Sequence, residues 1–127
     1  MQEKHLFEYA VIRVVPRVER EEFINAGIIL YCPAQRFLKV IYHIEESRVR
    51  ALCSKADIEQ LNAYLIAFEQ ICLGGKVGGF IGTLPIASRF RWLTATRSSV
   101  VQSSKVHPGF CIDADATLKK LFEDLVL

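Results

Sequence analysis

The sequence lacks any apolar run approaching the roughly 20 residues that a membrane-spanning helix needs, so we expect no membrane association. Its first five residues, MQEKH, include an acid and no apolar stretch followed by small residues, which argues against a secretory signal. Four cysteines are present, but none forms a C-x-x-C pair or has a histidine within metal-ligand spacing. This pattern argues against a structural zinc site and predicts reduced thiols in a cytoplasmic protein, with no metal and no cofactor.

Acidic residues are missing from residues 70–112, which carry five bases and no carboxylate. The whole chain has a formal net charge of only +2, because acids outnumber bases on both sides of this stretch. An anion can approach such a stretch without repulsion, so a binding site for anions is one interpretation. The alternative is that its bases pair with glutamates of the first half of the chain, namely Glu19, Glu21, Glu22, Glu45 or Glu46.

Motifs for nucleophilic and nucleotide chemistry are also missing. No serine lies in a G-x-S-x-G sequence. The glycine-rich residues 74–82 have neither the spacing of a phosphate-binding P-loop nor a strand before them, and their five glycines predict a mobile loop instead. His107 is the best candidate for a general base, and Glu22 is the carboxylate that would orient it.

The length of 127 residues, with 51% hydrophobic and 24% charged residues, is typical of one soluble globular domain. Runs of β-branched and aromatic residues predict strands over residues 7–15, 24–32 and 37–44. The short link between the second and third strands predicts an antiparallel hairpin. Gly27 interrupts the second strand, which indicates a bulge or the close approach of another backbone.

The longest predicted helix covers residues 54–73. Ser54, with Asp57 three residues later, resembles a capping box at its start. Apolar residues then recur at three- and four-residue steps and form one stripe, which we expect to pack on the sheet: Ile58, Leu61, Leu65, Phe68 and Cys72.

Shorter helical segments complete the prediction. We expect a short helix or turn over residues 17–22, a second over residues 45–53, and a last helix capped by Asp113 or Asp115. The apolar face of that last helix would consist of Leu118, Leu121, Phe122 and Leu125. The order of elements predicts an α+β fold: a single domain, residues 1–127, whose antiparallel sheet of about four strands has helices packed on one face.

Residues 88–111 carry the polar groups that best suit a ligand. Arg89 and Arg91 alternate with Phe90 and Trp92, so a strand here would place both guanidinium groups on one face. Guanidinium and hydroxyl groups bind phosphate or carboxylate, and bases interleaved with aromatic rings suit single-stranded nucleic acid. The structural alternative is that the rings are core and the hydroxyls only satisfy loop backbone. The candidate ligand-binding residues are Arg89, Arg91, Arg97, Ser98, Gln102, Lys105, His107 and Asn25.

Two stretches of the chain resemble a known bacterial family. The first is REEFINAGIIL, at residues 20–30, after the strand sequence YAVIR; the second comprises RF, LTA, RSS, VQ, VH and Gly109 within residues 89–109. Together they resemble the domain-of-unknown-function family numbered 3037, with Thr96 and Lys105 standing where that family has prolines. The family has no established activity. The resemblance implies a small stand-alone bacterial protein and, by association only, a protein partner that is a kinase resembling the HipA type.

Two functional hypotheses follow from these residues. The first is a non-catalytic binding or accessory module, whose surface accepts a phosphate, a nucleotide, a nucleic acid or a protein partner, with Glu22 and Asn25 supporting that surface through hydrogen bonds. The alternative is a small hydrolase or transferase acting on a phosphate-bearing substrate. In that enzyme His107 would be the acid or base, and the arginines would stabilise developing charge.

Overall fold

A computed structural model describes residues 3–127 as five strands, five α-helices and two 3-10 turns. The strands are β1 (His5–Val14), β2 (Ile24–Cys32), β3 (Phe37–Tyr42), β4 (Val101–Ser103) and β5 (His107–Cys111). The helices are α1 (Glu46–Leu52), α2 (Ile58–Leu73), α3 (Gly79–Gly82), α4 (Ile86–Leu93) and α5 (Ala114–Leu125), with the 3-10 turns η1 (Val18–Arg20) and η2 (Lys76–Gly78). The predicted α+β class and the predicted positions of the first three strands are confirmed.

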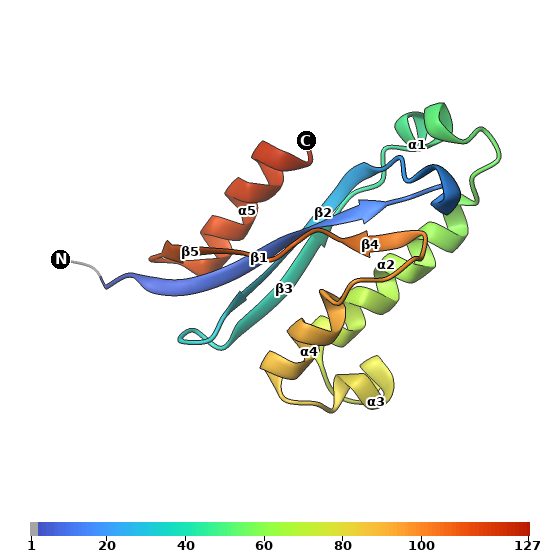
Figure 1. Cartoon of the computed structure of the whole chain (residues 1–127). Helices are drawn as coiled ribbons and strands as arrows, with labels where there is room; N and C mark the ends of the chain where they lie inside the picture. Colours follow the sequence, from blue (N-terminus) through green and yellow to red (C-terminus); the bar gives the residue numbers. More distant parts are fainter. Residues whose placement is uncertain (1–2) are drawn as a thin grey trace.

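The five strands form one antiparallel sheet around β1 (Figure 1). β2 pairs with β1 from Glu8 to Val14, and β3 pairs with β2 as the predicted hairpin. The opposite edge of β1 is shared: β5 pairs with its first half and β4 with its second half. β1 and β2 are apolar on both alternating faces, so this central pair needs cover on both sides.

Helices cover both faces of the sheet, so the prediction that they pack on one face is wrong. On one face, Ile12 and Ile29 belong to a buried cluster with Leu65 and Phe68 of α2 and with Phe90 of α4. On the other face, strand residues pack against α5 in a second cluster, whose members include Val11, Ile28, Leu30 and Leu118. Figure 1 shows α5 on the opposite side of the sheet from α2 and α4.

The predicted long helix starts four residues later than Ser54. Asp57 is the N-cap of α2, and its carboxylate accepts a hydrogen bond from the Gln60 amide at 3.0 Å. The predicted stripe is otherwise confirmed, because Leu61, Leu65, Phe68 and Cys72 are buried and Ile58 packs at the margin of the core. The last helix is likewise capped by Asp113, which accepts from the amides of Asp115 and Ala116, although Leu125 on its predicted apolar face keeps 38% of its surface exposed.

Within the glycine-rich residues 74–82, Lys76–Gly78 form η2 and Gly79–Gly82 form α3, so the prediction of a loop is wrong. The Gly75 amide donates to the Gly82 carbonyl at 2.8 Å and closes the segment on itself. A Cβ on Gly82 would lie 2.5 Å from the Gly75 carbonyl oxygen, and a Cβ on Gly78 would lie 3.1 Å from the Gln70 oxygen. Glycine thus permits a compact pair of turns to pack closely on the end of α2.

Among residues 3–127, no helix has the length and apolar character needed to cross a membrane.

Candidate functional site

The segment that carries Arg89 and Arg91 is the helix α4, so the prediction that a strand places both guanidinium groups on one face is wrong. Phe90 and Leu93 are buried and Ile86 packs beside them, which is the i, i+4, i+7 spacing of an apolar helical stripe. Residues two apart on a helix point in very different directions. Arg89 and Arg91 therefore serve separate parts of the molecule.

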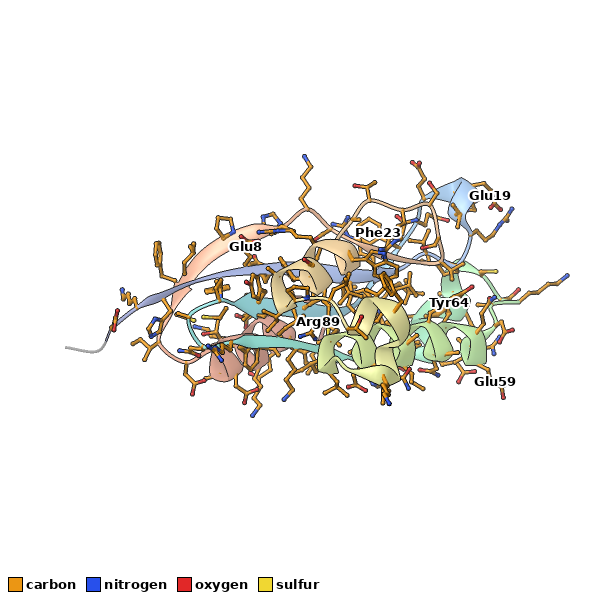
Figure 2. The ribbon with its side chains drawn as sticks, turned by 90° about the horizontal axis from the view of Figure 1, so that it is seen from below. Glu8, Glu19, Phe23, Glu59, Tyr64 and Arg89 are labelled. Carbon is orange, nitrogen blue, oxygen red and sulfur yellow. The ribbon has the colours of Figure 1, made fainter. Side chains whose placement is uncertain are left out.

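Arg89 lies inside the helical layer and bonds to backbone. Its Nη1 donates to the carbonyls of Ile71 at 3.0 Å and Cys72 at 2.7 Å, and its Nε donates to the carbonyl of Leu84 at 3.0 Å. Three of its five N–H donors are occupied in this way. Figure 2 labels Arg89 among α2, α3 and α4. Arg89 therefore connects the helices to one another and does not serve as a ligand contact.

Arg91 points the other way and forms a bidentate ion pair with Glu8 of β1. Nη1 and Nη2 lie 2.5 and 2.9 Å from the two carboxylate oxygens, and this bonding raises the pKa of Arg91 above its ordinary value. Pairing with an acid from the first half of the chain was one of the two interpretations of the acid-free stretch, but Glu8 is not among the glutamates named for it. Glu22, one of those, pairs with Arg20 at 2.5 Å, which lowers the pKa of Glu22.

The other predicted ligand-binding residues do not form one surface either. His107, on β5, stacks on Tyr9 with ring centroids 5.3 Å apart and faces the α5 side of the sheet. Gln102, on β4, is the cross-strand partner of Arg13, four residues further along β1 or about 13 Å away. Lys105 and Ser98 are exposed. Glu22 follows η1, beyond the far end of β1, so the structure does not bring it to His107.

Asn25 lies on the α5 side with Gln102. Its Nδ2 donates to the Leu125 carbonyl at 3.1 Å and so ties β2 to the end of α5. Asn25 and Gln102 are both cross-strand partners of Arg13, a residue that sequence reasoning did not select. A base between buried apolar residues of a strand was the signal that could have identified it.

Arg97 is the predicted arginine that does border a cavity. Its guanidinium carbon lies 4.1 Å from the centre of the Trp92 ring, and its Nη2 donates to the Trp92 carbonyl. Burial lowers the pKa of Arg97 below its ordinary value. No carboxylate within residues 3–127 forms an ion pair with it. Arg97 is thus a half-buried cation that donates one guanidinium N–H to the Trp92 carbonyl.

The cavity beside Arg97 has a volume of about 280 Å³ and lies between α2 and the segment that leads from α4 into β4. Its walls are almost entirely apolar. Arg97 contributes a charge, and Ser99 and Tyr64 contribute hydroxyl groups. The lining residues are Tyr64, Ala67, Phe68, Ile71, Trp92, Leu93, Arg97, Ser99, Val100 and Val101. Tyr64 and Trp92 keep 49% and 41% of their surface exposed, so two aromatic rings remain accessible there. Sequence reasoning missed Tyr64, because a single tyrosine on a long helix carries no local signal.

Residues 99–101 form one wall of this cavity, and hydrogen bonds to their backbone carbonyls hold that wall in place. The Val15 amide donates to the Val100 carbonyl at 2.7 Å, the Ser99 hydroxyl donates to the Val101 carbonyl at 2.6 Å, and Gln102 Nε2 donates to the Ser99 carbonyl at 2.8 Å. The pocket thus has one wall formed by α2 and another wall that is hydrogen-bonded to the chain at the end of the central strand. Within the described part of the chain, no three His, Cys, Asp or Glu side chains gather as a metal ion would require.

The fold and its pocket define a small α+β domain with an apolar cavity, bordered by an arginine that forms no ion pair within the described residues. The chain belongs to a family described as protein of unknown function (DUF3037), whose model matches residues 9–126. The resemblance seen in the two sequence stretches is thereby confirmed. Comparison with curated proteins and comparison with solved structures each find no match.

Proposed function

We propose that this protein is a binding module whose pocket takes a small ligand with an apolar body and a single oxyanion group, either carboxylate or phosphate. The observation that carries the proposal is Arg97, a half-buried guanidinium without an acidic partner in residues 3–127, at the border of an apolar cavity. Ligand pockets are typically apolar with a few polar groups that fix orientation. An anion at Arg97 would supply the missing countercharge while the apolar body occupies the cavity.

The distribution of charge supports a ligand with one anionic group over a polyanion. Binding to nucleic acid requires several cations on one surface, because each phosphate contact contributes separately. Here Arg89 is bonded to carbonyls and Arg91 to Glu8, so neither is free to join Arg97. The cavity of about 280 Å³ is also just below the range for ligand pockets, roughly 300–1,000 Å³. A short-chain or single-ring acid fits these dimensions better than a folded polynucleotide.

The hydrolase or transferase alternative draws little support from the same geometry. A general base is normally oriented by a second group within hydrogen-bond reach. His107 stacks on Tyr9, while Glu22, its expected partner, bonds to Arg20. A binding role therefore remains the better-supported proposal.

Trp92 provides the readout for a direct test, because it is the single tryptophan of the sequence and it lines the pocket. We expect octanoate to change Trp92 fluorescence in a saturable manner. 1-Octanol lacks the charge-assisted hydrogen bond and acetate lacks most of the buried apolar area, so each should bind at least about tenfold more weakly. Octyl phosphate tests the phosphate form of the same head group, and a short oligonucleotide tests the polyanion.

Variants of Arg97 separate its role from general charge. Arg97→Met should remove the preference for octanoate over octanol, and Arg97→Lys should recover only part of it, because lysine lacks the planar fork. Arg48→Met, which removes an exposed base of α1, is the charge-matched control and should bind as the original chain does. Equal binding of octanoate by Arg97→Met and Arg48→Met would overturn the proposal, as would tighter binding of the oligonucleotide.

A further inference from the structure

Arg13 is a partly buried base in the central strand of the sheet. It lies between the buried residues Ile12 and Val14, and its side chain points to the face that carries α5, as does that of Val11 two residues earlier. Its Nε is shielded from solvent and has no hydrogen-bond partner among residues 3–127. A buried polar group without a partner is destabilising and is rare in folded proteins. A guanidinium kept at such a position needs a physical reason.

The local backbone and an aromatic ring hold this guanidinium in place. The register between β1 and β2 shifts between Ile12 and Arg13, so that Arg13 lies opposite Asn25 and Ala26 is the extra residue. Such a bulge changes the direction of a side chain and is common beside functional sites. The Arg13 guanidinium carbon lies 4.2 Å from the centre of the Phe23 ring, which remains 46% exposed. The stack fixes the cation but provides no hydrogen-bond acceptor for its N–H groups.

Two amide side chains flank Arg13 on the same face of the sheet. Gln102 of β4 and Asn25 of β2 are its cross-strand partners, and such pairs have Cα atoms about 4.5–5.5 Å apart. Each amide donates one N–H to a backbone carbonyl, Gln102 to Ser99 and Asn25 to Leu125. Each side-chain nitrogen therefore retains a second N–H donor, in a position fixed by the first.

Within residues 3–127, no carboxylate forms an ion pair with Arg13, and its buried Nε has no hydrogen-bond partner. This set of donors also differs from the pocket beside Arg97. Val101, which lines that pocket, pairs with Val14, whereas the adjacent Gln102 pairs with Arg13 and so lies on the other face of the sheet. A partly buried cation flanked by donors, without a countercharge, suits an oxyanion.

We propose that Arg13, Asn25 and Gln102 form a second binding site, for a carboxylate or phosphate group, on the α5 face of the sheet. The Nη edge of Arg13 is the charged donor, since its Nε is covered, and the two amides donate from either side. Phe23 is a positioning residue, because it holds the guanidinium flat and does not itself bind the oxyanion.

The test is a titration of ¹⁵N-labelled protein followed by the side-chain N–H signals of Asn25, Gln102 and Arg13. Phosphate and succinate are the two probes, and sodium chloride at matched ionic strength is the reference. We expect saturable shifts of these signals with at least one probe and no comparable shifts with chloride. Which probe produces the shifts also tells whether the site prefers a phosphate or a carboxylate. Shifts of the same size with all three salts would overturn the proposal.

Variants make the test specific. Arg13→Met should weaken probe binding at least about tenfold, the size expected for losing a charge-assisted hydrogen bond, whereas Arg13→Lys should retain part of it. Phe23→Leu keeps every donor and should weaken binding less. Arg48→Met is again the charge-matched control. Unchanged binding by Arg13→Met would overturn the proposal; if that variant does not fold, unchanged binding by Gln102→Met would do so. The response of Trp92 to octanoate should persist in Arg13→Met, so failure of either site is recognised separately.

Discussion

Replacing Arg89 by methionine removes the guanidinium that connects the end of α2 to the beginning of α4. Three hydrogen bonds are lost, to the carbonyls of Ile71, Cys72 and Leu84, at 2.7 to 3.0 Å. Hydrogen bonds to charged groups contribute about 1.5–3 kcal/mol each. Water can satisfy part of what is lost, because Arg89 is only half-buried. We therefore expect the free energy of unfolding to fall by about 2–4 kcal/mol, which lowers the Tm by roughly 10 °C.

Arg91→Met is a matched control on the same helix. It removes the ion pair with Glu8, in which the arginine side chain is 57% exposed, so its cost should stay below about 1 kcal/mol. Arg89→Lys should recover less than half of the loss, because one ammonium cannot reach three carbonyls in the geometry of a guanidinium. Urea unfolding followed by circular dichroism gives all three values. A loss under about 1 kcal/mol for Arg89→Met, or equal losses at Arg89 and Arg91, would contradict the structural role assigned to Arg89.

Three further outcomes test the core and the backbone. Phe68→Ala should lower the free energy of unfolding by about 3–5 kcal/mol in the same urea assay, since this ring is buried against the sheet; a loss below about 1 kcal/mol would mean an exposed face. With a thiol reagent at pH 8, Cys53 should react first, whereas Cys72, whose pKa burial raises to about 12, should react only on unfolding; equal rates would refute this order. Gly27→Ala should lower the free energy of unfolding by about 1–3 kcal/mol, because its Cβ would lie 2.6 Å from the Ile41 carbonyl oxygen. An unchanged Tm in thermal unfolding would instead show that the β3 backbone moves to make room for the methyl group.

Local sequence was sufficient for the parts of the fold that depend on near neighbours. Apolar β-branched runs predicted β1 to β3, and the stripe from Leu61 to Cys72 predicted the buried face of α2. Gly27 was expected to mark a bulge or a close approach, and both occur there, because the register shifts beside it and the Ile41 carbonyl contacts it. These signals are local because periodicity and turn chemistry act over a few residues.

The partners of the charged residues were decided only by the tertiary structure. Alternation of arginine with aromatic residues predicted a strand at Arg89 and Arg91, but burial of Phe90 and Leu93 at helical spacing outweighed it. Arg91 then met Glu8, 83 positions away in the sequence, and Arg89 met the carbonyls of α2. No local pattern encodes such contacts, since they depend on how the helices pack on the sheet.

The two proposed sites show the same division. Sequence identified Arg97, Asn25 and Gln102 as polar groups worth examining, but it placed them on one surface. The pleat of the sheet assigns successive residues to opposite faces, so Val101 reaches the pocket of Arg97 while Gln102 reaches Arg13. Sequence therefore supplied the chemistry of the donors, and the strand pairing decided which of them can act together.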